Sequence, residues 1–156
     1  WKMMIDPHVI GEDHLQQIER QLQGRKVVRY SQATEAMAAD AEVLIIDCFG
    51  LLSSIYHYAD VTYVGGGFGV GIHNLLEAAV WDVPVFFGPN NERFQEAQGL
   101  KACGGGIEIS HADDFTEAMD KLCDQPSLIA QYGEKAGAYV KQMTGATQKI
   151  LSVVKL

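Results

Sequence analysis

The stretch GGGFGVGIHNLLEAA, Gly65–Ala79, lies between two apolar runs, VTYV at 61–64 and PVFFG at 84–88. Both runs have the length and the β-branched and aromatic residues that are typical of buried strands. The segment 74–81 has apolar residues at helical spacing, so it predicts a helix that follows the glycines. A strand, a loop, a helix and a second strand form a βαβ unit with parallel strands. This stretch therefore predicts an α/β fold.

The same alternation extends to both sides of this unit. Further strands are predicted at 2–5, 26–30, 42–47 and 106–109. Helices are predicted at 12–22, from Ser31 onward, 51–59, 92–104, 112–123, 126–143 and 145–156, with Ser31 or Ala33 near the cap of the second. Because no repeat or linker interrupts this order, we predict a single Rossmann-like domain over residues 1–156, with a parallel sheet flanked by helices.

The composition restricts the class of protein. A chain of 156 residues with 47% hydrophobic and 21% charged residues suits one globular domain. The net charge of −8 argues against a nucleic-acid-binding surface, which is basic. The three cysteines, Cys48, Cys103 and Cys123, form no CxxC pair, so a zinc site or a disulfide framework is not expected. No apolar run approaches the roughly 18 residues of a membrane span, and we find no signal peptide.

The glycine-rich loop itself has two explanations. Five of the seven residues from Gly65 to Gly71 are glycine, and glycine lets backbone N–H groups approach a ligand without interference from a Cβ atom. The start of the following helix adds partial positive charge, so the loop suits a phosphate. Alternatively the loop only packs the helix onto the sheet, although one or two glycines would suffice for such a turn. The dinucleotide pattern GxGxxG fails at Ile72, and the P-loop pattern GK[ST] is missing.

Polar residues follow the glycines where the predicted helix begins. Asn74 is a favourable N-cap, and Glu77 has the spacing of a capping box with it. The alternative is that Glu77 binds the two hydroxyls of a ribose, because a carboxylate offers two acceptor oxygens to two donors. A loop for phosphate followed by a carboxylate for ribose indicates a nucleotide-sugar site.

The segment GGGFGVGIHNLLEAAVWDVPVFFGPNNERFQEA, with DCFGLLSSIYHYADVTYV before it, resembles the 3-deoxy-D-manno-octulosonic acid (Kdo) transferases. These enzymes build the inner core of lipopolysaccharide. Their pattern has GGS or GGGF, HNxLE, and a strand that ends in GPN or GPH. The resemblance extends from about Met4 to the C-terminus. It implies the GT-B fold, in which two Rossmann-like halves face a cleft, and this chain is similar to the C-terminal, donor-binding half.

The resemblance also implies a set of donor-binding residues. The CMP phosphate would be held by the loop glycines, Gly65, Gly66, Gly67, Gly69 and Gly71. His73 and Asn74 would lie at the phosphate or sugar end of the pocket, and Glu77 would bind the ribose. Gly50 and Leu51 would lie against the cytosine, and the wall of the cleft would be shaped by Gly88, Pro89 and Asn90.

The chain departs from the family pattern at two positions. His8 follows Pro7 where family members commonly have an arginine, and Val70 stands where some relatives have a basic residue. A neutral imidazole offers one N–H donor where arginine offers five. We therefore expect backbone amides to carry more of the phosphate contact, with Arg29 as a candidate compensating charge. The alternative for Arg29 is a solvated strand end.

The activity that the resemblance implies is transfer of Kdo from CMP-Kdo to a lipid A precursor, at the cytoplasmic face of the bacterial inner membrane. No cofactor and no metal is expected, and no nucleic acid. The membrane anchor, the acceptor site and the catalytic base would lie in an N-terminal half outside this chain. We therefore expect a piece of a longer enzyme without catalytic residues of its own. Two alternatives remain: the UDP-sugar-binding half of another GT-B glycosyltransferase or epimerase, and a non-catalytic nucleotide-binding module.

Overall fold

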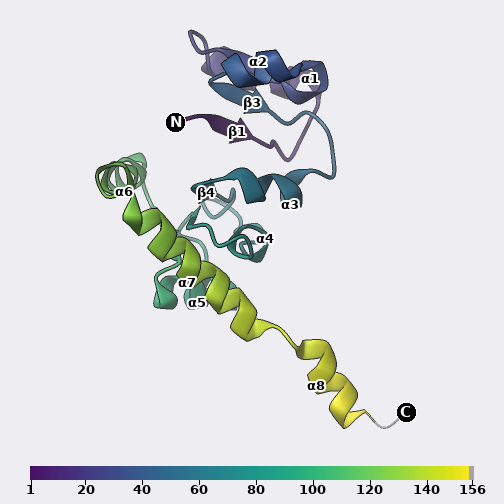
Figure 1. Cartoon of the computed structure of the whole chain (residues 1–156), viewed down its shortest axis with the longest axis vertical. Coiled ribbons are helices and arrows are strands. Elements are labelled where there is room, and N and C mark those ends of the chain that lie inside the picture. Colours follow the sequence, from purple (N-terminus) through teal and green to yellow (C-terminus); the bar gives the residue numbers. More distant parts are fainter. Residues whose placement is uncertain (155–156) are drawn as a thin grey trace. The chain divides into compact units, whose positions relative to one another are not determined.

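A computed structural model gives the fold of residues 1–154. The last two residues of the helix expected at 145–156 lie outside this range. The chain forms two compact units, Trp1–Ser54 and Ile55–Leu156, called here the N-terminal and C-terminal units. Each unit contains one three-stranded parallel sheet (Figure 1). The predicted class, α/β with parallel strands and helices between them, is confirmed within each unit, whereas a single domain over the whole chain stays a prediction.

The N-terminal unit has the strand order β1-β3-β2. Its elements are β1 (Met3–Ile5), α1 (Glu12–Gln21), β2 (Val27–Arg29), the 3-10 turn η1 (Tyr30–Gln32), α2 (Glu35–Asp40) and β3 (Val43–Ile45). Ile5 and Arg29 both lie in register with Ile45, so the carboxyl ends of the three strands meet at one edge. Leu15 of α1 packs with Val43 and Ile45 in the core of this unit.

The cap of α2 differs from the expected one. Thr34 is the N-cap, and its hydroxyl oxygen accepts the N–H of Met37 at 3.2 Å. Ala33 lies next to this cap, whereas Ser31 lies within η1. The short helix α3 (Leu52–Ile55) crosses the boundary between the units, and the 3-10 turn η2 (Tyr56–Tyr58) follows it, so the helix predicted at 51–59 is divided.

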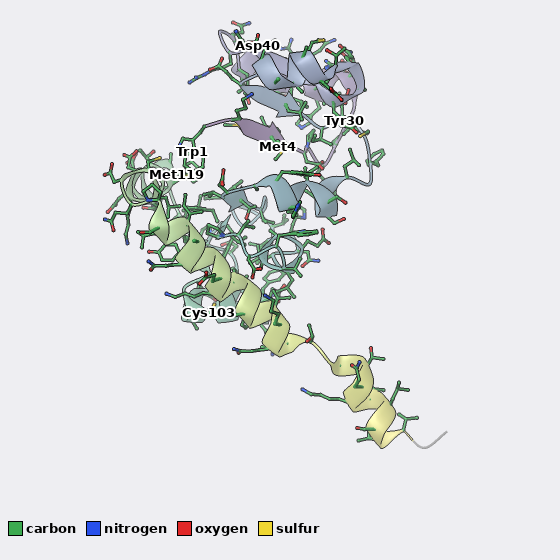
Figure 2. All side chains as sticks on the ribbon, viewed as in Figure 1. Trp1, Met4, Tyr30, Asp40, Cys103 and Met119 are labelled. Atoms are coloured by element: carbon green, nitrogen blue, oxygen red, sulfur yellow. The ribbon has the colours of Figure 1, made fainter. Side chains whose placement is uncertain are left out.

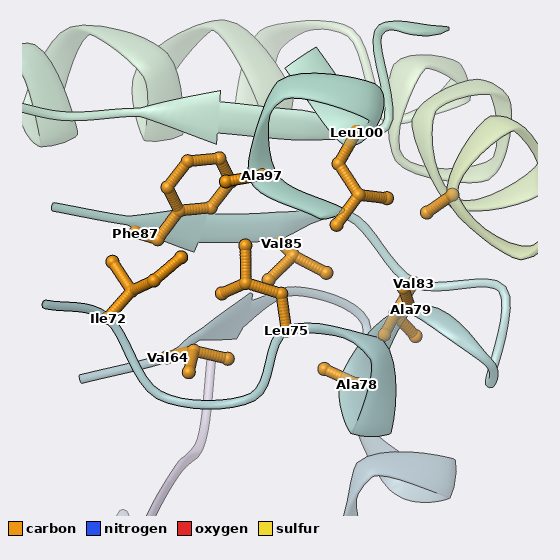
Figure 3. Close-up of a cluster of buried hydrophobic side chains, with 11 residues drawn as sticks. Val64, Ile72, Leu75, Ala78, Ala79, Val83, Val85, Phe87, Ala97 and Leu100 are labelled. Atoms are coloured by element: carbon orange, nitrogen blue, oxygen red, sulfur yellow. The ribbon is translucent and has the colours of Figure 1, made fainter. Parts of the chain in front are cut away.

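The C-terminal unit has the strand order β4-β5-β6. Its elements are β4 (Thr62–Tyr63), α4 (Leu76–Ala79), β5 (Val85–Phe87), α5 (Gln95–Cys103), β6 (Gly106–Glu108), α6 (Ala112–Asp124), α7 (Ser127–Met143) and α8 (Ala146–Val153). The central strand β5 is fully buried, and Val85 and Phe87 pack with Leu75 and Leu100 in the core that Figure 3 shows. Burial of β5 on both faces explains its continuous apolar sequence.

Two glycines of α7 allow a close approach of the turn between α4 and β5. A Cβ atom on Gly133 would lie 2.0 Å from the carbonyl oxygen of Asp82, and one on Gly137 would lie 1.7 Å from its Oδ1. Asp82 has a positive φ of 56°, and its carboxylate contacts Lys141 of the same helix at 3.3 Å. The turn that follows α4 therefore packs directly against the backbone of α7.

The surface of the described residues gives two further observations. No helix within 1–154 combines the length and the apolar character that a membrane span needs. The three thiols are unpaired, and Cys103, labelled in Figure 2, is half-buried at the end of α5.

Candidate functional site

The glycine-rich loop after β4 is a small antiparallel hairpin. Gly66 is bridged to Ile72, and the N–H of His73 donates to the carbonyl of Gly65 at 3.2 Å. The N–H of Gly67 donates to the carbonyl oxygens of Val70 at 3.0 Å and Gly71 at 3.3 Å. These hydrogen bonds close the loop on itself, so it has a defined shape before any ligand arrives.

Most of the glycines are explained by packing. Gly66 and Gly67 have φ values of +88° and +83°, which side chains rarely adopt. A Cβ atom on Gly67 would lie 2.8 Å from the Cα of Gly88, and one on Gly88 would lie 2.7 Å from the carbonyl oxygen of Gly66. A Cβ atom on Gly71 would enter the ring of Phe94. Packing therefore explains Gly66, Gly67 and Gly71, more than the one or two glycines that we expected a packing turn to need.

Gly69 is different, because a Cβ atom there would meet nothing within 4 Å in the described part of the chain. It lies at the exposed tip of the hairpin between Phe68 and Val70. The N–H groups of these three residues make no backbone hydrogen bond to the residues that the structure describes. The tip can therefore present three neighbouring donors to an anion.

The helix after the loop is shorter than expected. The predicted span 74–81 contains only the four residues of α4, and its N-cap is Leu75. One turn of helix carries little of the dipole that a long helix would supply. The start of this helix can therefore contribute less to phosphate binding than we expected, and the hairpin amides are the remaining candidate donors.

Asn74 and Glu77 form a pair beside the hairpin. The side-chain oxygen of Asn74 accepts the N–H of Leu76 at 3.1 Å, which fixes the orientation of its amide. Its Nδ2 then donates to Oε1 of Glu77 at 2.9 Å. This geometry differs from a capping box, in which Glu77 would accept the backbone N–H of Asn74. The pair holds the half-buried carboxylate of Glu77 in place through its Oε1.

The loop after β5 is attached to the hairpin. The N–H of Asn90 donates to the carbonyl of Gly67 at 2.9 Å, and its side-chain amide donates to the carbonyl of Gly69 at 3.4 Å. Gly88 lies against Gly66 and Gly67 through the close contacts described above. Gly88 and Asn90 therefore contact the hairpin, whereas the role of Gly88, Pro89 and Asn90 in a cleft wall stays a prediction.

Sequence reasoning missed Asn91, which follows the GPN motif. Its side chain is fully buried and donates to the carbonyl of Gly88 at 2.8 Å and to Glu108 at 2.9 Å. Gln98 and Lys101 donate to its oxygen at 2.8 and 2.9 Å. Hydrogen bonds from Lys101 and Asn91 hold the pKa of Glu108 below its usual value. The sequence indicates this buried network only by the presence of a polar residue, Asn91, shortly after an apolar strand.

Arg29 lies in the N-terminal unit and is occupied by two carboxylates. Its guanidinium contacts Glu19 at 2.7 and 2.9 Å and Glu12 at 2.7 and 3.0 Å. Hydrogen bonds from Arg29 and Gln16 lower the pKa of Glu12 to about 2. Because four of the five guanidinium donors are used within the unit, the geometry argues against Arg29 as a compensating charge for phosphate, and also against a merely solvated strand end.

The other candidates of the N-terminal unit follow the carboxyl ends of its strands. His8 follows β1, and Gly50 and Leu51 follow β3. At the end of β3, Asp47 accepts the N–H of Ser31 at 2.8 Å and also its hydroxyl. Burial raises the pKa of Asp47, but these hydrogen bonds and the charge of Arg29 outweigh it and leave the pKa lowered. The grouping of these residues with the glycine loop stays a prediction.

Comparison with known proteins gives several relatives that carry the name 3-deoxy-D-manno-octulosonic acid transferase. The chain is 33% identical over 115 residues to the 3-deoxy-D-manno-octulosonic acid transferase of Chlamydia trachomatis serovar D, covering 72% of this chain and 26% of that protein. It is 33% identical over 85 residues to the transferase of the same name from Aquifex aeolicus, covering 53% of this chain and 24% of that protein. The chain thus spans about a quarter of the length of these relatives. No protein-family model matches it.

Solved structures agree on the fold. The C-terminal CMP-Kdo binding domain of WaaA from Acinetobacter baumannii superposes with a TM-score of 0.76 at 22% identity, covering 88% of this chain and 72% of that domain. Spinosyn forosaminyltransferase SpnP gives a TM-score of 0.55 at 15% identity, covering 97% of this chain and 43% of that one.

The solved structures show the fold of this chain, an α/β fold like that of the C-terminal domain of a GT-B protein. In sequence the chain is similar to the Kdo transferases over about a quarter of their length, as the sequence motifs predict.

Proposed function

We propose that this chain is the donor-binding part of a Kdo transferase and that it binds CMP-Kdo. The observation that supports this most directly is the junction of the glycine hairpin, Glu77 and the loop after β5, in a chain related to Kdo transferases. The whole protein would transfer Kdo to a lipid A precursor at the cytoplasmic face of the bacterial inner membrane. Its catalytic base and its acceptor site would lie outside this chain.

In this proposal backbone N–H groups make most of the hydrogen bonds to the phosphate. The N–H groups of Phe68, Gly69 and Val70 donate to the phosphate oxygens of CMP-Kdo, and the same donors stabilise the charge of the departing CMP. Because hydrogen bonds already fix the hairpin, little reorganisation accompanies binding. Glu77, oriented by Asn74, accepts both hydroxyls of the ribose.

The test is calorimetric titration of the chain with CMP. We expect a dissociation constant of about a millimolar, since in this proposal the other half of the cleft lies outside this chain. Glu77→Gln should weaken CMP binding at least about tenfold, because the amide offers only one acceptor oxygen to two hydroxyls. Glu117→Gln, which makes the same charge change at an exposed position of α6, is the control and should bind CMP like the parent chain.

Parallel titrations with UMP and UDP separate the donor classes. Tighter binding of the uridine nucleotides would contradict the CMP-Kdo proposal and favour a UDP-sugar enzyme. Failure of all three nucleotides to bind at ten millimolar, or equal affinities of Glu77→Gln and the parent chain, would refute the site.

A further inference from the structure

Asn91 satisfies every hydrogen-bonding position of its side chain. The two Nδ2 hydrogens reach Gly88 and Glu108, and Oδ1 accepts from Gln98 and Lys101. A buried carboxamide with four partners is held in one orientation, and removing it leaves several polar groups unpaired. Its partners come from the loop after β5, from α5 and from β6, so this one side chain joins three elements.

The network continues through the backbone of the same loop. The N–H of Asn91 donates to the carbonyl of Pro89 at 2.8 Å, and the carbonyl of Asn91 accepts the N–H of Phe94 at 3.0 Å. The side chain of Gln98 also donates to that carbonyl at 3.0 Å. The loop between β5 and α5 is therefore shaped around Asn91.

This loop in turn holds the glycine hairpin. Gly88, whose carbonyl is bonded by Asn91, has its Cα against Gly67, and the N–H of Asn90 donates to the carbonyl of Gly67. A shift of Gly88 toward the hairpin would displace Gly67, because the two backbones are packed in direct contact. A chain of direct contacts therefore connects Asn91 to the base of the hairpin whose tip carries the proposed phosphate donors.

We propose that Asn91 is a positioning residue for donor binding: it sets the loop 88–90 and, through that loop, the glycine hairpin. The second half of this inference rests on the proposed function, whereas the first half concerns the loop alone. Asn91 itself is buried and acts through Gly88 and Asn90 without touching the donor.

The experiment compares Asn91→Leu with Thr62→Val. Thr62 is a matched control, because it is a buried polar residue of the same sheet whose hydroxyl donates to the carbonyl of Pro84 at 2.9 Å, at the opposite end of β5. Both variants keep the number of side-chain heavy atoms and lose buried hydrogen bonds. Gln98→Ala is a milder variant, because Gln98 is exposed and its loss removes the hydrogen bonds to Oδ1 and to the backbone carbonyl of Asn91 but leaves those that Nδ2 of Asn91 donates.

The first readout is amide hydrogen exchange measured by NMR. In Asn91→Leu and Gln98→Ala, the amides of Asn90 and Gly67 should exchange at least about tenfold faster relative to the β5–β6 amides of Val85 and Ile109. In Thr62→Val these ratios should match those of the parent chain. A uniform increase over all four amides in Asn91→Leu and Gln98→Ala would overturn the positioning role, since it indicates only lost stability.

The second readout is the dissociation constant for CMP. We expect it to rise at least about tenfold in Asn91→Leu and less in Gln98→Ala, with no change in Thr62→Val. Equal CMP affinities of the parent chain and Asn91→Leu would overturn the link to the donor. If the parent chain binds no CMP, the proposed function and this link fall together, while the exchange ratios still decide the role of Asn91 in the loop.

Discussion

At the scale of single residues, the glycines of the hairpin separate into two kinds. Gly67 has a positive φ and faces the backbone of Gly88, whereas Gly69 is open and has no backbone requirement for glycine. The sequence predicts a special loop here but cannot separate the two kinds, because the contact partner of Gly67 lies 21 residues further along the chain.

Alanine substitutions should therefore affect different properties at these two positions: stability at Gly67 and CMP binding at Gly69. Gly67→Ala should lower the free energy of unfolding by about 2–4 kcal/mol, from the left-handed backbone and the contact with Gly88. Gly69→Ala should change it by less than about 0.5 kcal/mol but weaken CMP binding, because its methyl group would stand at the tip where we place the phosphate. Urea unfolding and CMP titration measure the two effects. Unchanged CMP affinity in Gly69→Ala would contradict the assignment of the tip.

At the scale of elements, the contact between α7 and the turn at Asp82 rests on two glycines. Alanine is normally the better helix former by roughly 1 kcal/mol. Gly133→Ala and Gly137→Ala should nevertheless destabilise the C-terminal unit, because each methyl group would overlap Asp82. We expect losses of about 1–3 kcal/mol in the free energy of unfolding for each variant.

A second substitution distinguishes the two glycines. The obstacle to Gly137→Ala is the side chain of Asp82, so Asp82→Gly should restore stability in the double variant, since glycine also tolerates the positive φ there. The obstacle to Gly133→Ala is the backbone carbonyl of Asp82, which remains after that change. Thermal unfolding of both pairs should therefore show rescue for Gly137→Ala alone. Rescue of both variants, or of neither, would contradict this packing.

Elements were easier to predict from the sequence than the contacts between them. The six strands within residues 1–154 lie where the apolar runs place them, although only β5 is buried along its whole length. Helix α4 is shorter than predicted. Periodicity shows which residues face the core, but it does not show where a helix begins, and here the side chain of Asn74 accepts the N–H of Leu76 just before the helix. Arg29 and Asn91 show the larger difficulty. Their partners Glu12, Glu19 and Glu108 are brought to them only by the folded chain, so no local pattern indicates an ion pair or a buried polar network.

At the scale of the whole molecule, the net charge of −8 opposes an anionic ligand, and salt screens that repulsion. If neutral backbone amides bind the phosphate, raising NaCl from 50 to 500 mM should leave the dissociation constant for CMP within about twofold or lower it. A cationic clamp predicts the reverse, a several-fold weakening, because screening removes an attraction. Calorimetry at both salt concentrations, with cytidine as the uncharged control, makes the comparison. Marked weakening by salt for CMP and not for cytidine would contradict the amide site and direct attention to Arg93, an exposed cation in the loop between β5 and α5.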